Sequence, residues 1–353
     1  MSGVVIEPIP DLAAARQDWS DLADAAGSPF STWEWADVWY RHLGGGRPLL
    51  LHRCRAADGR VAAILPLYLS TRRPARTLRL LGHGPADQLA PVCAPADRDL
   101  AAAGLRRALD ERVGGWQVAV LDRLPGDESW SEPIGGRVVH RESSPALVAE
   151  GRDWEAFLAS RSRNFRDQAR RRERRLAREH DLSFRLSDDP ERLDADLDTL
   201  LRLHDARWEG GTRSFVPPLD ALHRDFARAA LGRGWLRLWL LELGGHPAAV
   251  WLGYRMGGVE WYYQAGRDPA FEREAVGFVL MNHTIREALN DGMREYRLLI
   301  GGEGYKDRYA NADRGVETAM LSRGPRGAAA VAGARLARRV PTAARRRLKR
   351  LAG

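Results

Sequence analysis

The pattern of apolar and polar residues is clearest between residues 235 and 309, where it predicts an α+β unit. Three β-rich apolar runs are separated by glycine turns, and the third run ends at Asp268-Pro269, because proline cannot donate to a strand ladder. Apolar residues then recur at helical spacing, and a short strand leads into the glycine-rich turn Gly301–Lys306. The predicted strands span 236–243, 248–254, 259–265 and 295–300, and the helix spans 276–290. Free N–H groups at the start of such a helix favour a phosphate.

The first part of the chain repeats this order of elements. A hairpin with an Asp58-Gly59 turn is followed by a strand, a loop, a helix and another strand. The hairpin spans 49–70, the strands 78–81 and 116–121, and the helix 99–113. Because the period is far longer than that of a solenoid, we expect two duplicated α+β lobes, each a mixed sheet flanked by helices. The predicted divisions are an N-terminal lobe at 1–150, a C-terminal lobe at 151–322, and a basic tail at 323–353.

A helix rich in arginine is expected between the two units, at residues 153–180. It contains nine arginines from Arg161 to Arg178 and only a thin apolar face. We favour a solvated face balanced by acidic residues, but a polyanion-binding surface and a surface for a phosphorylated or lipid-linked acceptor stay open. No aromatic residues alternate with the arginines, which disfavours a platform for single-stranded nucleic acid.

Composition limits the class of protein. A length of 353 residues suffices for two domains, and the cysteines, Cys54 and Cys93, form no paired metal-binding motif, although one disulfide stays open. The first residues do not resemble a signal peptide, and no apolar run approaches the roughly 20 residues that a spanning helix needs. We therefore expect a cytoplasmic protein, or one at the inner face of the membrane.

The net charge of +8 belongs to the predicted tail. Residues 323–353 carry ten arginines or lysines and no acidic residue, and subtracting ten from +8 leaves residues 1–322 at −2. The charge therefore does not favour a nucleic-acid partner. The tail has the composition of an amphipathic or disordered segment that binds an anionic membrane surface. The oligomeric state does not follow from the sequence.

Lysine is rare in this chain, which makes one lysine a candidate for chemistry. Only Lys306 and Lys349 occur, against 53 arginines. Because the composition uses arginine wherever either cation would serve, a lysine within the glycine-rich turn indicates a specific role for its compact charge.

With the repeat, the arginine helix and this turn in view, the chain resembles a known family. Residues 28–322 resemble the GNAT acyltransferases in their tandem, FemAB-like form, and within it the BioF2-like or CelD-like branch. The motifs that carry the resemblance are Trp261-Tyr262-Tyr263, the helix opening at Gly277, Gly304-Tyr305-Lys306, Pro29-Phe30 through Trp39, and Leu65-Pro66-Leu67. The resemblance implies transfer of an acyl group from a thioester, usually acyl-CoA, to an amine or hydroxyl.

The resemblance also implies where the donor binds. In such folds two strands splay apart around the pantetheine arm, and the pyrophosphate lies at the N-terminus of the next helix. The residues implied here are Gln264, Ala265, Gly266, Ala275, Val276, Gly277 and Phe278, with Arg273 as a replacement positive charge. The sequence departs from the usual pyrophosphate loop at Glu274 and Val279, and some tandem relatives use aminoacyl-tRNA as the donor instead.

Three residues of the glycine-rich turn are the catalytic candidates. Glu303 is the candidate general base, since a carboxylate at a strand end beside a cleft can accept a proton. Tyr305 is the candidate donor to the leaving thiolate or the thioester carbonyl, and Lys306 is the candidate ligand of a phosphate or carboxylate. Each has a structural alternative: a solvated glutamate, a core tyrosine and a surface lysine.

Further candidates surround the expected acceptor side. Arg207, Trp208 and Tyr263 are predicted to bind substrate, with helix-end packing as the alternative for the first two. We expect Asp268 to form a turn and His283 to be buried. His83 and Asp87 are candidates at the border of the cleft, with a simple loop as the alternative.

The sequence lacks the signatures of a covalent hydrolase, a Walker loop or a metal site, so direct transfer without a metal is expected. The predicted acceptor is a small molecule or an envelope precursor, and the resemblance suggests envelope or exopolysaccharide biosynthesis. Two alternatives stay open: aminoacyl transfer from tRNA, and a non-catalytic scaffold at a membrane surface.

Overall fold

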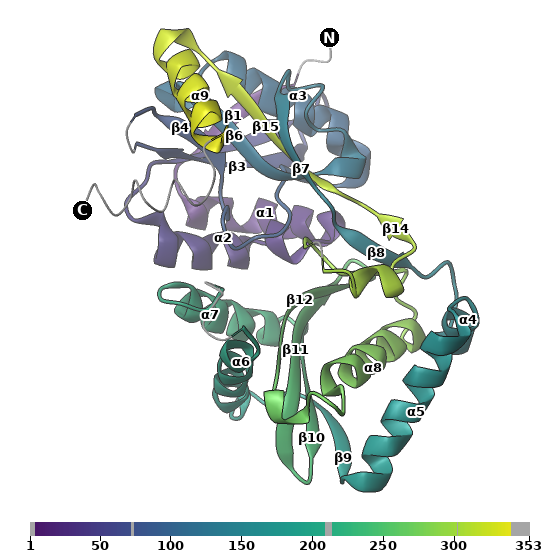
Figure 1. Ribbon diagram of the computed structural model, residues 1–353. Helices are drawn as coiled ribbons and strands as arrows, with labels where there is room; N and C mark the ends of the chain where they lie inside the picture. The colour runs from purple at the N-terminus through teal and green to yellow at the C-terminus, as the bar shows by residue number, and fades with distance from the viewer. Residues whose placement is uncertain (1–3, 72–73, 209–213, 302, 340–353) are drawn as a thin grey trace.

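The computed structural model describes residues 4–71, 74–208, 214–301 and 303–339, and these form two lobes, each built on a mixed sheet (Figure 1). The first sheet contains β1 (Val5–Ile9), β2 (Leu49–Arg55), β3 (Val61–Ser70), β4 (Thr77–Leu80), β5 (Val92–Cys93), β6 (Val118–Pro125), β7 (Arg137–Glu142) and β15 (Val316–Ser322). The second contains β8 (Pro145–Val148), β9 (Leu182–Leu186), β10 (Leu236–Leu243), β11 (His246–Met256), β12 (Val259–Arg267), β13 (Glu295–Arg297) and β14 (Ala312–Asp313).

Helices cover both sheets. They are α1 (Leu12–Ala26), α2 (Trp33–Trp39), α3 (Arg98–Asp110), α4 (Trp154–Ala159), α5 (Arg163–Glu179), α6 (Leu193–Trp208), α7 (Leu219–Gly232), α8 (Val276–Asn290) and α9 (Gly324–Arg339). In the second lobe α8 and α5 lie on one side of the sheet, and α6 and α7 lie on the other, facing α1 and α2 of the first lobe (Figure 1). The predicted α+β class is confirmed.

The two sheets have the same topology. In the first, an antiparallel run β1-β2-β3-β4 joins β6 in parallel, and in the second, β9-β10-β11-β12 joins β13 in parallel. Beyond these joins the lobes exchange strands, because β15 lies between β6 and β7, and β8 lies between β13 and β14. The predicted boundaries at 150 and 322 therefore do not follow the sheets: each half of the chain ends as a strand of the other lobe.

One of the buried hydrophobic clusters is shared by both lobes. Side chains of α6 and α7 pack with those of α1, α2 and β3 in a single buried cluster. Trp35 lies edge-on to Phe226, with ring centroids 4.8 Å apart. The backbones of Gly27 and Gly257 approach so closely that a Cβ on Gly257 would lie 2.6 Å from the Gly27 Cα. Such close packing leaves no room for a loose interface.

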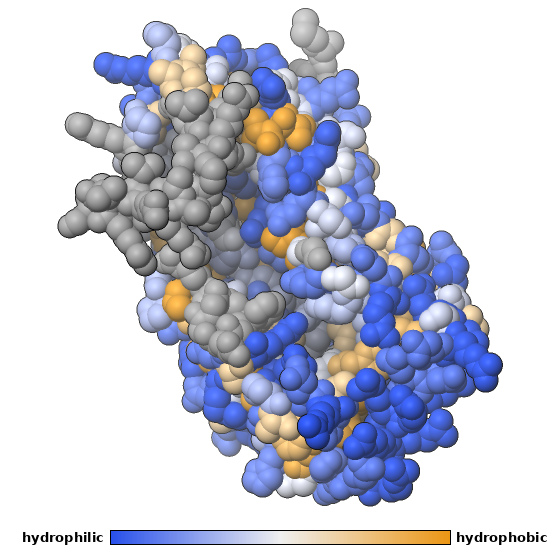
Figure 2. Space-filling view, viewed as in Figure 1, coloured by the Kyte–Doolittle hydropathy of each residue, from blue (hydrophilic) through white to orange (hydrophobic). Residues whose placement is uncertain are grey.

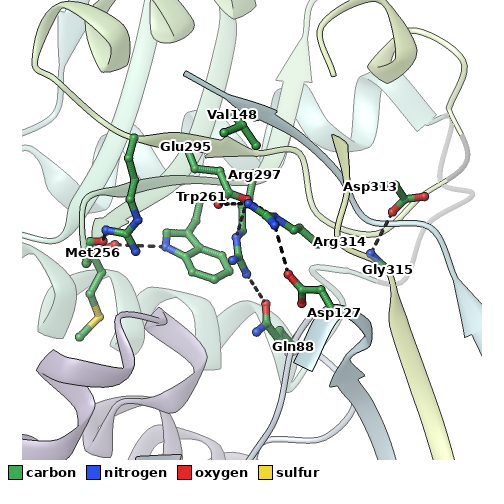
Figure 3. Close-up of polar contacts among 12 residues, drawn as sticks. Gln88, Asp127, Val148, Met256, Trp261, Glu295, Arg297, Asp313, Arg314 and Gly315 are labelled. Carbon is green, nitrogen blue, oxygen red and sulfur yellow. Dashed lines mark hydrogen bonds and ion pairs between the residues drawn. The ribbon is translucent and has the colours of Figure 1, made fainter. Parts of the chain in front are cut away.

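Polar contacts reinforce the lobe junction beside the exchanged strands (Figure 3). Glu295, at the start of β13, accepts hydrogen bonds from Arg297 and Arg314 at 3.0 Å each. Arg297 also donates to Gln88 of the first lobe at 2.8 Å, and Arg314 lies 3.4 Å from Asp127. Because Glu295 is only 5% exposed, this network holds both lobes around a buried carboxylate.

Several sequence predictions hold with exact bounds, and others differ, two of them substantially. The predicted strand 236–243 and helix 276–290 match β10 and α8. The arginine helix predicted at 153–180 is two helices, α4 and α5, because the side chain of Ser162 accepts a hydrogen bond from the Phe165 N–H and begins a new helix. The strand predicted at 295–300 ends at Arg297, where the chain turns away from the sheet.

The start of the predicted tail belongs to the folded body. Helix α9 packs on the first sheet, with Val331 against Val118 and Val120, and Gly327 lies directly against the backbone of Gln117. Residues 340–353 of the predicted tail lie outside the described residues. Within the described part of the chain, no helix has both the length and the apolarity to cross a membrane.

Candidate active site

The second sheet opens at the parallel join of β12 and β13. The strands pair only from Val259 with Glu295 to Trp261 with Arg297, and β12 then continues while its neighbour turns away. The turn contains Leu299 at φ 58°, a backbone conformation that bulky residues rarely adopt. Such local strain persists only where the surrounding structure enforces it, and it concentrates at functional sites.

A narrow cavity of about 260 Å³, which we call the donor slot, fills this opening. Its walls come from β11, β12, α8 and the segment that follows the glycine-rich turn. Four residues predicted to bind the donor line it: Ala265, Gly266, Gly277 and Phe278. Their role in donor binding stays a prediction, but the sequence and the geometry select the same opening.

The other predicted donor residues lie around the slot. Gln264 lines the neighbouring cleft, Val276 is fully buried, and Ala275 is the N-cap of α8 with φ 55°. No described side chain caps the N-terminus of α8, so its first N–H groups can bind an anion. Arg273 lines a separate small pocket beside α5.

Two positions that line the donor slot, 266 and 277, differ in whether packing requires a glycine there. A Cβ on Gly266 would overlap the backbone of α6 at Leu203 and His204, so packing requires this glycine. A Cβ on Gly277 would meet only the Arg267 Cδ, at an ordinary 3.5 Å. Packing therefore does not explain why residue 277 is a glycine.

A second, larger cavity of about 640 Å³ lies between the lobes, and we call it the acceptor cleft. The first lobe contributes residues of the loop 83–87, Arg123 and three residues between 39 and 47, and the second contributes β12, described residues of the turn that follows β13 and the start of α7. The cleft and the donor slot meet, since four residues line both: Arg207, Tyr262, Ala265 and Tyr305. A group held in the slot can thus face a group held in the cleft.

A β-bulge in β12 lies at this junction. Leu252 of β11 pairs with Gln264 and the next residue, Gly253, pairs with Tyr262, so Tyr263 has no partner in the register. Tyr262 and Tyr263 pack in different buried clusters, as successive strand residues do, and both line the cleft. The hydroxyl of Tyr263 donates to the Pro85 carbonyl of the first lobe at 2.9 Å.

The three predicted catalytic residues all line the acceptor cleft. Lys306 is not a surface lysine, because it is 4% exposed and donates to the Ile300 carbonyl at 2.7 Å. Its ammonium also pairs with the Glu303 carboxylate at 3.0 Å, and that side chain is 42% exposed. Lys306 therefore fixes the turn that carries Glu303 and brings a positive charge to the cleft wall.

Tyr305 lies at the junction of the two cavities. Its hydroxyl donates to the Tyr262 hydroxyl at 3.2 Å. Burial, with the adjacent Tyr262, raises the pKa of Tyr305 well above its ordinary value. Tyr305 therefore stays protonated and suits hydrogen-bond donation to a thioester better than proton transfer. The sequence analysis named Tyr262 only within the motif Trp261-Tyr262-Tyr263 and did not predict it as a site residue.

Asp87 is a second carboxylate at the cleft, supplied by the first lobe. Burial raises the pKa of Asp87 to about 7, although the Arg123 guanidinium, 3.0 Å away, opposes the shift. A base whose pKa lies near the working pH is well suited to accept a proton. His83 also lines the cleft, and burial, with nearby arginines, lowers its pKa to about 3.

Of the remaining candidates, Arg207 lines the cavities, whereas Asp268 and His283 have structural roles. Arg207 lines both cavities and donates to the Ala265 carbonyl at 3.5 Å, while the side chain of Trp208 lies outside the described part of the structure. Asp268 forms a turn, because its carboxylate accepts from the Ala270 N–H at 2.9 Å. His283 is buried and stacks on Phe184, as expected.

The described residues contain no group of three or more His, Cys, Asp or Glu side chains placed to hold a metal ion. Cys54 and Cys93 are both buried free thiols, and burial raises the pKa of each to about 12. Their thiolates are therefore scarce at neutral pH, and neither thiol lines the donor slot or the acceptor cleft.

Comparison with known proteins agrees with this geometry. Residues 163–307 match the family model of the acetyltransferase (GNAT) domain. A search of curated proteins by similarity gave no match. Among solved structures, FemX has a TM-score of 0.64 at 11% identity, over 90% of this chain and 97% of that one.

Two further solved structures share the fold. The C-terminal domain of a putative lysylphosphatidylglycerol synthetase from Agrobacterium fabrum has a TM-score of 0.60 at 12% identity, over 91% of this chain and 96% of that one. A tandem GNAT protein from the clavulanic acid pathway has a TM-score of 0.51 at 13% identity, over 91% and 99%.

The family match identifies a GNAT-type acetyltransferase domain in residues 163–307, and the described structure has two lobes of the same topology. Residues 163–307, which contribute most of the donor slot, match the GNAT domain, and the chain shares its two-lobed fold with these solved structures. The narrower BioF2-like or CelD-like assignment stays a prediction.

Proposed function

We propose that this protein transfers an acyl group from acyl-CoA to an amine or hydroxyl acceptor bound between the lobes. The observation that carries the proposal is the meeting of two cavities at Arg207, Tyr262, Ala265 and Tyr305. A donor arm in the slot would present its thioester at this junction, and the acceptor would approach from the cleft. Such positioning converts a bimolecular reaction into an effectively unimolecular one.

The reaction needs no covalent enzyme intermediate. The acceptor nitrogen or oxygen attacks the thioester carbon, the C–S bond breaks, and the CoA sulfur leaves as a thiolate that takes up a proton. Asp87 or Glu303 would accept the proton that the nucleophile loses, since both carboxylates line the cleft. Tyr305 and Tyr262 would donate hydrogen bonds to the developing charge on the thioester.

The acceptor cleft supports an acceptor with an acidic group. Four cationic side chains line it, Arg47, Arg123, Arg207 and Lys306, against the carboxylates of Asp87 and Glu303. An envelope precursor fits this description and remains part of the proposal, as does attachment to an anionic membrane surface. The names of two solved relatives, FemX and the lysylphosphatidylglycerol synthetase, are compatible with aminoacyl transfer as the alternative.

Thermal unfolding with acetyl-CoA, long-chain acyl-CoA and free CoA tests the donor. A ligand at 100 times its Kd adds about 2.7 kcal/mol to the free energy of unfolding, which raises the midpoint by several degrees. Gly277→Glu should abolish the shift without disturbing the fold, because its Cβ meets only an ordinary contact. The matched control is Gly232→Glu, at the end of α7, where a Cβ meets nothing within 4 Å.

The two variants separate the outcomes. A shift that is lost in Gly277→Glu and kept in Gly232→Glu supports acyl-CoA as the donor. Release of free CoA can then be followed with a thiol reagent while amine and hydroxyl acceptors are screened. If no CoA species shifts the midpoint, the acyl-CoA proposal is wrong, and aminoacyl-tRNA is the next donor to test.

A further inference from the structure

The arginines of α5 form a small pocket next to the donor slot. This basic pocket, of about 200 Å³, is lined by Arg171, Arg172, Arg175, Leu176, Arg273 and Glu274. Three of its arginines come from α5 and the fourth comes from the segment that leads into α8. The two helices lie side by side at the edge of the second lobe (Figure 1), and the space-filling view shows a largely hydrophilic surface there (Figure 2).

The charges of this pocket are not balanced. Arg175 pairs with Glu179 at 2.7 Å, but Arg171, Arg172 and Arg273 form no ion pair with any described residue. Elsewhere on α5, Arg163, Arg170 and Arg178 pair with acidic residues, whereas Arg166 and Arg174 donate to backbone carbonyls. A solvated face alone does not explain why cations from two separate segments converge on one concave site with a single carboxylate.

The basic pocket adjoins the outer end of the donor slot. The Arg172 guanidinium lies over the ring of Phe278, 5.9 Å from its centroid, and Phe278 lines the slot. Arg273 and Glu274 precede the uncapped N-terminus of α8, where Gly277 also lines the slot. A donor arm that leaves the slot past Gly277 would therefore carry its distal end toward the four arginines.

We propose that the basic pocket binds a phosphomonoester at the far end of the donor, the ribose 3′-phosphate of a CoA thioester. A phosphomonoester carries nearly two negative charges and three acceptor oxygens, which guanidinium groups bind with charge-assisted hydrogen bonds. This inference rests on the proposed function and adds a selectivity to it. The protein prefers free acyl-CoA over a carrier-protein thioester, whose phosphopantetheine has no ribose phosphate.

The test compares two ligands that differ only in that phosphate. The Kd values of CoA and 3′-dephospho-CoA are measured by calorimetry on the full chain and on the Arg171→Ala, Arg172→Ala and Arg273→Ala variants. The control is Arg174→Ala, an exposed arginine of α5 that does not line the pocket. Unfolding midpoints without ligand show whether each variant keeps its fold.

For the unmodified protein we expect dephospho-CoA to bind about ten- to a hundredfold more weakly than CoA, the range for hydrogen bonds between charged groups. The pocket variants should weaken CoA binding while leaving dephospho-CoA binding nearly unchanged, so that the ratio falls toward one. Arg174→Ala should keep the full ratio. Measuring both ligands on each variant isolates the interaction between the 3′-phosphate and the substituted arginine, as in a double-mutant cycle.

Two results would overturn the inference while leaving the proposed function intact: equal Kd values for both ligands, or a ratio that survives the pocket variants. Failure of both ligands to bind would instead contradict the acyl-CoA donor itself. Aminoacyl-tRNA serves as a further arm. If its binding needs these arginines and CoA binding does not, the pocket serves a nucleic-acid donor and the inference is wrong.

Discussion

Asp87 provides a quantitative test of the cleft, because the fold opposes its ionisation. Burial raises its pKa from 3.8 to about 7, and the side chain is 12% exposed. A raised carboxyl pKa means that the folded state binds more protons than the unfolded state between these pH values. Stability due to this group is therefore complete below about pH 4 and falls as the pH rises through 7.

The size of the effect follows from the shift. Each pKa unit corresponds to 1.36 kcal/mol, so a shift of about three units opposes folding by about 4 kcal/mol above pH 7. Asp87→Asn removes this penalty and retains an oxygen that can accept from Arg123. Because part of the penalty is already present at pH 5, the advantage of the variant should grow by about 2–3 kcal/mol between pH 5 and pH 8.

Urea unfolding of both proteins at pH 5 and pH 8 measures this difference, and other titrating groups cancel in the comparison at each pH. Asp24→Asn, an exposed position on α1, controls for the loss of one negative charge. If Asp87 is also the base, the stabilised variant should lose most of its transfer activity, a trade-off typical of active sites. A variant whose advantage stays constant or shrinks between pH 5 and pH 8 would refute the reasoning.

Three further substitutions test the packing and the site. Gly257→Ala should lower the free energy of unfolding, measured by denaturant titration, by roughly 2 kcal/mol or more, because position 257 combines a φ of +60° with a close contact to Gly27. The control is Gly46→Ala, with φ +69° and no neighbour within 4 Å, which should show only the cost of placing an alanine at positive φ. Tyr305→Phe should reduce kcat about tenfold or more with little change in KM, and unchanged kcat would remove it from the reaction. Glu295→Gln should destabilise by about 2 kcal/mol in urea unfolding, because two arginines lose a buried carboxylate; no loss would show that the network is dispensable.

The sequence predicted local elements well where one periodicity dominates. The strands β10–β12 and the helix α8 follow directly from apolar runs and glycine turns. The exchange of β8 and β15 between the sheets was not predictable in the same way, because the apolar pattern of a strand does not identify the strand with which it pairs. Pairing partners are selected by tertiary packing, which a single sequence does not display.

The candidate site shows the same limit. The glycine-rich turn was found because lysine is rare in this chain and Lys306 lies among glycines. The burial of Lys306 and its hydrogen bond to a backbone carbonyl were not visible in the sequence. Asp87 was noted only as a border residue, since its raised pKa arises from burial between lobes far apart in the chain. The bulge in β12, which leaves Tyr263 without a partner in the register of β11, was likewise not visible in the sequence.

The duplication itself explains how one fold supplies both halves of the site. β4 and β12 occupy the same position in their sheets, each being the last antiparallel strand before the parallel join. In the second lobe β12 continues for nine residues, and its far half lines the donor slot. In the first lobe β4 stops after four residues, and the chain that follows turns out as the loop 81–87, which brings His83, Pro85 and Asp87 to the acceptor cleft. Because Tyr263 donates to Pro85, the two equivalent strand ends meet, so a change in either lobe should alter the alignment of donor with acceptor.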